Sequence, residues 1–173
     1  MAKPHDSEPN RAPARVVELV VNLDDATGES LGYAIDRLID RGALDAWATP
    51  ITMKKNRPAA MLSALVREHD QHPFAELMLK LTGSFGVRYR AWDRLVLDRA
   101  WHDRPTRLGE VKLKAGALNS ETITVKPEFD DVVRLSSRAN VALPVAQRAA
   151  QAAADALFDE LRRQKQRDAK GAG

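Results

Sequence analysis

The side chains best suited to chemistry are two adjacent carboxylates, Asp24 and Asp25, which follow an apolar run in the segment NLDDATGE (22–29). Carboxylates placed side by side at a turn repel each other, and a hard divalent cation such as Mg²⁺ or Mn²⁺ relieves that repulsion because it prefers oxygen ligands. Acidic residues also suit the first turn of a helix. For an Asp-Asp pair considered alone, the helix start is the better explanation, so a metal site needs further support.

A basic segment is the second candidate. Lys54, Lys55 and Arg57 lie within MKKNRP (53–58), and no acidic residue occurs between Ala46 and Arg67. Such a cluster could neutralise a polyphosphate, and an Arg side chain can bind a phosphate through two hydrogen bonds. A solvated hairpin loop explains the same residues equally well. The Gly-rich phosphate-binding motifs GxxxxGK[ST] and GxGxxG do not occur in the sequence.

Two further sets of polar residues carry weaker signals. Arg88 and Arg90 are two positions apart on a predicted strand, so they share one face, which could bind an anion or simply face solvent. Lys126, Glu128 and Asp131 lie in KPEFDD (126–131), where Pro and acidic residues make a good helix start. The His residues show no metal-ligand spacing, and no Ser-His-Asp or GxSxG pattern is present.

The composition narrows the class of protein. The chain of 173 residues has a formal net charge of +3, but residues 162–173 hold five basic side chains against one acidic side chain. The excess charge therefore belongs to a tail, and a nucleic-acid-binding surface is not implied. The sequence has no Cys, and no apolar run approaches the ~20 residues that span a bilayer. The first residues lack the apolar core of a secretory signal, so we expect a cytoplasmic protein without a membrane partner.

Periodicity predicts an α+β fold whose first part is ferredoxin-like. Residues 1–14 are rich in Pro and charge and are predicted to be disordered. Over residues 15–100 the pattern reads βαββαβ, which is the ferredoxin-like arrangement. The predicted strands are Val16–Leu23, Asp45–Ile51, Ala60–Val66 and Val87–Leu97. The predicted helices cover residues 31–39 and begin again at Pro73. The basic segment then connects the second strand to the third.

A smaller ββαα part is predicted over residues 101–161. Gly109–Leu118 and Ser120–Val125 have the pattern of two strands, and Phe129–Ala139 and Pro144–Gln166 that of two helices, the second of them long and rich in Ala. Residues 162–173 are predicted to form a basic C-terminal tail whose end frays. The sequence therefore predicts two domains between two tails.

The candidate sites coincide with the motifs of a known family. Segment 22–29 resembles the Asn-Ile-Asp-Asp-Met-Thr-Gly-Glu signature of the LarC family, the nickel insertion proteins of nickel-pincer cofactor synthesis. The run PITMKKNRP (50–58) matches the family's Pro-Ile-x-Met-Lys-Lys-x-Arg-Pro, and GVR (86–88) and KPEFDD (126–131) follow in the expected order. The resemblance covers about residues 16–155, and four ordered motifs are more specific than any one of them.

The resemblance implies a specific reaction. The LarC family inserts Ni²⁺ into pyridinium-3,5-bisthiocarboxylic acid mononucleotide, consumes CTP and releases CMP and pyrophosphate, which makes it a nickel chelatase (cyclometallase) of the lyase class. The matched region resembles its C-terminal half, which binds CTP and a divalent metal, Mg²⁺ or Mn²⁺, and assembles into homo-oligomers. On this sequence Asp24 and Asp25 would hold that metal, while the catalytic residues would be basic. Those catalytic residues would be Lys54, Lys55 and Arg57, and the nucleotide would contact the same three together with Arg88, Lys126 and Glu128.

The sequence also departs from the family pattern. The family's longer N-terminal region, often His-rich, has no counterpart here, so we expect either a separate His-rich nickel-binding partner chain or a relative that has lost nickel delivery. Ala26 replaces the usual Met, and Thr82-Gly83-Ser84 replaces a Thr-rich run. An alternative function is a non-catalytic nucleotide-sensing or regulatory module, because ferredoxin-like folds host many regulators. Release of pyrophosphate from CTP would separate the enzyme from the regulator.

Overall fold

A computed structural model of the chain describes residues 15–171, with side chains from Arg15 to Arg167. These residues form two compact units, 15–95 and 96–171, each with a hydrophobic cluster of its own. The predicted disorder of residues 1–14 lies outside the described residues. None of the described helices is long and apolar enough to cross a bilayer.

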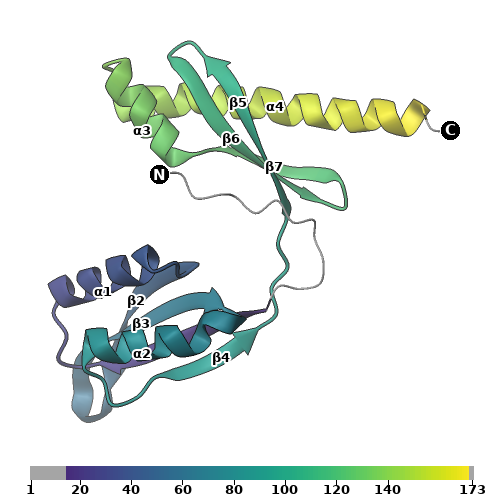
Figure 1. The fold of residues 1–173 in the computed structure, drawn as a ribbon. Coiled ribbons are helices and arrows are strands. Elements are labelled where there is room, and N and C mark those ends of the chain that lie inside the picture. Colours follow the sequence, from purple (N-terminus) through teal and green to yellow (C-terminus); the bar gives the residue numbers. More distant parts are fainter. Residues whose placement is uncertain (1–14, 172–173) are drawn as a thin grey trace. The chain divides into compact units, whose positions relative to one another are not determined.

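The first unit is a four-stranded antiparallel sheet with two helices on one face (Figure 1). Its elements are β1 (Val16–Leu23), α1 (Gly28–Asp40), β2 (Asp45–Met53), β3 (Arg57–Arg67), α2 (Gln71–Thr82) and β4 (Arg88–Trp92). The strand order is β2-β3-β1-β4, and every neighbouring pair is antiparallel. This βαββαβ succession in one sheet is the ferredoxin-like arrangement, so the predicted fold of this part is confirmed.

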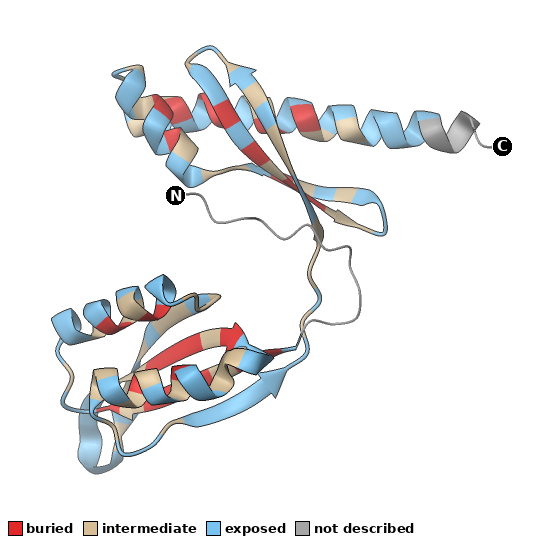
Figure 2. Ribbon diagram, in the orientation of Figure 1, coloured by how far each residue is buried: buried red, intermediate tan, exposed pale blue. Residues whose placement is uncertain are grey.

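Alternation along the strands creates the core of the first unit. Leu19 on β1 and Ala64 on β3 are register partners, and both belong to the buried cluster that includes Leu38 of α1 and Met78 of α2. Burying a large apolar side chain completely contributes about 1.5–3 kcal/mol. Figure 2 shows the buried residues gathered where the helices cover the sheet. Because side chains alternate along a strand, Asn22 of β1 lies on the opposite face from Leu19.

The turn after β1 is fixed by the cap of α1. Thr27 is the N-cap residue, and its Oγ1 accepts a hydrogen bond of 3.2 Å from the backbone N–H of Ser30. The hydroxyl of Ser30 donates in return to the carbonyl oxygen of Thr27 at 2.9 Å. The first bond satisfies one of the backbone N–H groups that a helix start otherwise leaves without a partner. The cap fixes the start of α1, and Asp24 and Asp25 lie in the short connection between β1 and this start.

The second unit is a three-stranded antiparallel sheet, in the order β5-β6-β7, whose core residues pack with those of two helices. Its elements are β5 (Asp98–Thr106), β6 (Gly109–Leu118), β7 (Glu121–Pro127), α3 (Phe129–Arg138) and α4 (Leu143–Gly171). Leu113 of β6, Leu135 of α3 and Leu157 of α4 lie in one buried cluster. The mixed α+β class predicted for the whole chain is confirmed.

Several predicted boundaries were wrong. β2 extends to Met53 instead of ending at Ile51, and β3 begins at Arg57 instead of Ala60, so Arg57 lies in a strand and not in the connecting loop. The strand predicted over Val87–Leu97 ends at Trp92, and the chain then leads to β5, a strand that the sequence prediction lacked, so the second part has three strands instead of two. It was missed because β5 is an edge strand without a buried residue, and its charged residues and Pro105 obscure the alternation. Helix α4 extends to Gly171 instead of ending at Gln166, because no helix-breaking residue occurs between them.

Candidate functional site

One end of the first sheet gathers the segments that carry most of the predicted site residues. β1 ends there, and because β3 and β4 run antiparallel to β1, the β2–β3 hairpin and the start of β4 lie at the same end. Figure 1 shows these connections together at the left of the first unit. We call this region the loop end, formed by residues 24–27, 54–56 and 83–87.

Asp24 and Arg57 are joined directly at the loop end. Arg57 Nη1 donates a hydrogen bond of 2.8 Å to Asp24 Oδ2, although 33 positions separate the residues. The side chains remain 31% (Asp24) and 58% (Arg57) exposed, so a ligand can reach both. The hydrogen bond from Arg57, together with the charges of Arg57 and Lys54, holds the pKa of Asp24 below its ordinary value of 3.8 despite partial desolvation. Asp24 is therefore an ionised carboxylate at neutral pH.

The tip of the β2–β3 hairpin presents two lysines. Met53 and Arg57 are the last register pair, so Lys54, Lys55 and Asn56 make the turn. Lys55 (φ 64°) and Asn56 (φ 56°) adopt left-handed conformations, which cost energy for residues other than Gly. Both lysines are exposed, and neither forms an ion pair with a residue that the structure describes. The tip therefore adds two exposed cations to the hairpin whose Arg57 pairs with Asp24, and the charge of Lys54 also acts on Asp24.

Asp25 has different neighbours from Asp24, although the two residues are adjacent. Asp25 lines a small pocket of about 150 Å³ together with Ser30 of α1 and Thr82 of α2. The other lining residues are apolar: Leu23, Ala26, Leu31, Ala34 and Leu81. The loop end thus offers one carboxylate beside the basic hairpin and one beside the helices. A cation bound by both Asp24 and Asp25 would therefore lie between the basic hairpin and the helices.

Arg88 reaches the loop end from β4. Its Nη2 donates a hydrogen bond of 2.8 Å to Asn22 Oδ1, across 66 positions of sequence. Sequence reasoning missed Asn22, although a signal was present: Asn22 and Asp24 are two positions apart, so an extended chain places both on one side. Arg90 lies two positions from Arg88 on β4 and therefore on the same face, and its guanidinium lies over the indole ring of Trp92, 4.6 Å from the ring centroid. Of the two arginines, Arg88 is the one held at the end of β1.

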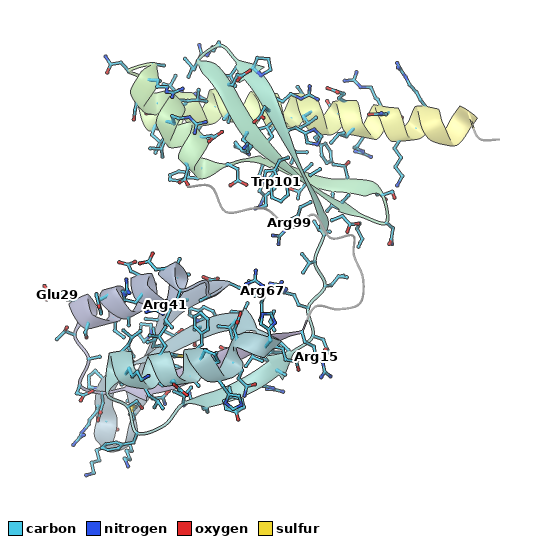
Figure 3. The ribbon with its side chains drawn as sticks, in the orientation of Figure 1. Arg15, Glu29, Arg41, Arg67, Arg99 and Trp101 are labelled. Atoms are coloured by element: carbon cyan, nitrogen blue, oxygen red, sulfur yellow. The ribbon has the colours of Figure 1, made fainter. Side chains whose placement is uncertain are left out.

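Lys126 and Glu128 belong to the second unit. Glu128 Oε1 accepts a hydrogen bond of 3.4 Å from Trp101 Nε1 and lies 3.5 Å from Lys114 Nζ. Lys114 Nζ also lies 5.9 Å from the centroid of the Trp101 ring, and Lys114 is the register partner of Lys126. Figure 3 labels Trp101 on this sheet. Trp101, Lys114 and Glu128, which we call the Glu128 cluster, therefore form a local network within their own unit.

The donors at the loop end are of the type that hard cations prefer. Among residues 15–167, no group of three or more His, Cys, Asp or Glu side chains could hold a metal alone. Mg²⁺ does not require such a cage, because it keeps several waters and binds through one or two carboxylates plus substrate phosphates. Asp24 and Asp25 fit that requirement, with Lys54 and Lys55 available to phosphates. A cation at this end would be shared with a phosphate-bearing ligand.

The chain is similar to proteins of a described family. A family model named nickel insertion protein matches residues 5–147. A putative nickel insertion protein of Myxococcus xanthus is 39% identical over 132 residues, which cover 76% of this chain and 34% of the relative. The pyridinium-3,5-bisthiocarboxylic acid mononucleotide nickel insertion protein of Lactiplantibacillus plantarum is 36% identical over 151 residues, 87% of this chain and 36% of the relative. The chain spans about a third of the length of these relatives.

Two solved structures are also similar. LarC2, the C-terminal domain of a cyclometallase involved in the synthesis of the NPN cofactor of lactate racemase, matches in its apo form with a TM-score of 0.77 and 35% identity, covering 82% of this chain and 97% of LarC2. A protein of Methanopyrus kandleri AV19 matches with a TM-score of 0.62 and 31% identity, covering 83% of this chain and 88% of that protein. Motifs, fold and relatives agree: the chain belongs to the nickel insertion protein family and resembles the C-terminal half of its members.

Proposed function

We propose that this chain provides the nucleotide- and metal-binding part of a nickel insertion enzyme, a chelatase of the cyclometallase type in the lyase class. The complete reaction inserts Ni²⁺ into pyridinium-3,5-bisthiocarboxylic acid mononucleotide and converts CTP to CMP and pyrophosphate. The observation that carries the proposal is the meeting of Asp24, Arg57 and Lys54 at the exposed loop end. Family membership supports the overall reaction.

Asp24 and Asp25 are the proposed ligands of Mg²⁺ or Mn²⁺. When bound, the cation would neutralise charge on the triphosphate, as divalent ions do in phosphoryl transfer. Asp24 suits this role because it is ionised at neutral pH and partly exposed. Arg57 pairs with Asp24 in the absence of ligand. When the nucleotide binds, Arg57 would release Asp24 and bind the outer phosphates instead. Nickel is the substrate metal in this scheme and is distinct from the cation at Asp24.

The basic residues of the hairpin are the proposed catalytic groups. A carboxylate or thiocarboxylate of the substrate forms a bond to the α-phosphorus of CTP, while the bond from that phosphorus to the bridging oxygen breaks and pyrophosphate leaves. Water then bonds to the same phosphorus, the bond from phosphorus to the substrate breaks, and CMP leaves. Lys54, Lys55 and Arg57 stabilise the negative charge that builds on the departing pyrophosphate. Arg88 at the same end is a further proposed contact of the nucleotide. Lys126 and Glu128, the remaining predicted nucleotide contacts, belong to the second unit.

The proposal includes an assembly and a location. The chain acts in the cytoplasm as a homo-oligomer, with a His-rich nickel-binding chain as the partner that delivers Ni²⁺. It has no nucleic-acid or membrane partner in this scheme. Deleting residues 162–173, which include the basic end of α4, should leave CTP binding unchanged. A loss of CTP binding would contradict the view that this basic segment lies outside the site.

Isothermal titration of CTP in the presence of Mn²⁺ tests the site. The wild-type chain should bind CTP with Mn²⁺, and Asp24→Asn should remove the metal-dependent part of the affinity. Asp40→Asn is the matched control, because Asp40 is also an exposed aspartate beside an arginine, 3.4 Å from Arg37 at the other end of α1. Absence of heat from the wild-type chain at millimolar CTP would overturn the proposal.

Pyrophosphate release separates an enzyme from a nucleotide sensor. The assay supplies CTP, Ni²⁺ and the nickel-free pyridinium mononucleotide. Because pyrophosphate leaves when the substrate bonds to the α-phosphorus, an enzyme, or a subunit assayed together with its partner chain, releases pyrophosphate only when CTP and the pyridinium mononucleotide are both present. The nickel product forms only when Ni²⁺ is present as well. Binding of CTP without release under any combination would favour the regulatory module.

A further inference from the structure

Phe85 is an apolar side chain in an unusual place. It lies in the connection between α2 and β4 and is fully exposed, whereas Phe74 of α2 is 6% exposed and belongs to the core. A large aromatic ring left entirely in water forgoes the stabilisation that burial gives. The position of Phe85 therefore calls for an explanation other than packing within the first unit.

The connection that carries Phe85 is held by its own hydrogen bonds. The backbone N–H of Ser84 donates to Thr82 Oγ1 at 3.2 Å, and the Ser84 hydroxyl donates to the Gly86 carbonyl oxygen at 3.1 Å. Gly83 ends α2 in a left-handed conformation, with φ 67°. The loop is thus short, and hydrogen bonds fix the backbone on both sides of residue 85. The exposed Phe85 ring therefore extends into solvent from a defined turn.

Both ends of this connection meet the proposed site. On one side, Thr82 lines the same small pocket as Asp25. On the other side, Arg88 donates its hydrogen bond to Asn22 at the end of β1. Phe85 is three residues from each, and three residues of extended chain span at most about 11 Å. The ring therefore stands at the rim of the loop end.

The groups proposed for the nucleotide at this end serve its charged part only. Asp24 and Asp25 would hold a cation, and Lys54, Lys55 and Arg57 would bind phosphates, so in the proposed arrangement none of these groups is left to contact a heterocyclic ring. A nucleotide has such a ring at the end opposite its outer phosphates. Stacking on an aromatic side chain stabilises a base whatever its identity, because every base has a π-face.

We propose that Phe85 stacks on the heterocyclic ring of the nucleotide bound at the loop end. The inference rests on the proposed function, because it needs phosphates anchored at Asp24 and the basic hairpin. It adds a binding role for a residue outside the four motifs. It also predicts that Phe85 supports pyrimidine nucleotides in general, so CTP and UTP should depend on it alike.

The experiment compares CTP with inorganic tripolyphosphate, which has the phosphates but no ring, by isothermal titration with Mn²⁺. Wild type should bind CTP more tightly than tripolyphosphate. Phe85→Ala should weaken CTP and UTP by about 5- to 150-fold, which corresponds to the ~1–3 kcal/mol of one base stacked on an aromatic ring. Its affinity for tripolyphosphate should stay unchanged. Phe85→Trp should keep CTP affinity and report the stacked ring as quenched fluorescence.

Leu95→Ala is the matched control, because Leu95 is also exposed (74%) but follows the far end of β4. Wild type that binds tripolyphosphate and CTP equally, or Phe85→Ala that loses neither CTP nor UTP, would overturn the stacking and leave the proposed function intact. Wild type that binds neither ligand would overturn both. The second arm titrates nicotinic acid mononucleotide, which is a pyridinium mononucleotide. If Phe85→Ala weakens binding of this compound and leaves CTP affinity unchanged, Phe85 contacts the substrate and the stacking on the nucleotide is overturned.

Discussion

The loop end of the first unit and the Glu128 cluster of the second surround a carboxylate differently. At the loop end, Asp24 pairs with Arg57 and also feels the charge of Lys54, while neither hairpin lysine forms a close ion pair with a described residue. In the second unit, Glu128 accepts a hydrogen bond from an indole N–H and lies beside one Lys side chain. Cations in excess at an exposed end attract an anionic ligand. The charge of Glu128 is compensated by the neighbouring Lys side chain, so this carboxylate serves mainly to stabilise the local structure.

The two units also have separate cores, and these give the largest expected effects. Leu38→Ala in the first unit and Leu113→Ala in the second should each lower the free energy of unfolding by about 2–5 kcal/mol, because both side chains are completely buried. Since the residues belong to separate clusters, hydrogen–deuterium exchange should rise mainly in the substituted unit. Equal loss of protection in both units would contradict independent cores.

Arg57→Ala tests the excess of cations at the loop end. It should weaken CTP binding by about 10- to 150-fold, because a hydrogen bond to a charged group is worth ~1.5–3 kcal/mol. CMP should be affected less, since Arg57 is proposed to contact the outer phosphates. Titration of both nucleotides measures the difference, with Arg37→Ala as the control from an exposed Arg–Asp pair of the same unit. Equal losses for CTP and CMP would refute the phosphate role.

Asn22→Ala tests whether Arg88 must be held in place. Loss of the 2.8 Å hydrogen bond frees the guanidinium, and we expect a fall in CTP affinity of about 2- to 10-fold, the size of one ordinary hydrogen bond. The effect should vanish in an Arg88→Ala background, because the two residues then no longer share an interaction. If Asn22→Ala lowers CTP affinity by the same factor in the Arg88→Ala background as in wild type, Asn22 acts independently of Arg88.

Lys126→Ala extends the comparison to the second unit. We expect CTP affinity to fall by at most about fivefold, the range of an exposed charge contact. Stability should stay unchanged or rise slightly, because Lys126 is the register partner of Lys114 and like charges opposite each other destabilise a sheet. Lys165→Ala on α4 is the control. A loss as large as that of Arg57→Ala would show that both units contribute equally to nucleotide binding.

The smallest expected effect is the pH dependence of stability. Arg57 and Lys54 lower the pKa of Asp24 below 3.8 in the folded chain. An ionised Asp24 therefore stabilises the fold at pH values above 3.8, and this contribution is lost as the pH falls from 3.8 through the lower folded pKa. Arg57→Gln should reduce that loss. Identical acid-unfolding curves for wild type and Arg57→Gln would contradict it.

Local pattern was sufficient for much of the fold. Period-two alternation predicted β1 within its observed bounds, and helical spacing followed by Gly42 predicted α1. The basic segment was correctly placed between the second and third strands. These features depend on neighbours a few residues away, where burial of one face leaves a regular signature. The edge strand β5 has no buried residue and therefore left no such signature.

The assembly of the candidate site was decided by tertiary structure. The sequence alone predicted a carboxylate pair at a turn and three basic residues in a loop, each with a structural explanation of equal or greater weight. The structure places Lys54 and Lys55 in that turn and Arg57 at the start of β3. Antiparallel pairing of β1 with β3 and β4 then brought Arg57 to Asp24 across 33 positions and Arg88 to Asn22 across 66. The same packing gave the adjacent Asp24 and Asp25 different surroundings. Strand register, which depends on burial over the whole sheet, sets these long-range contacts, and no local spacing encodes it.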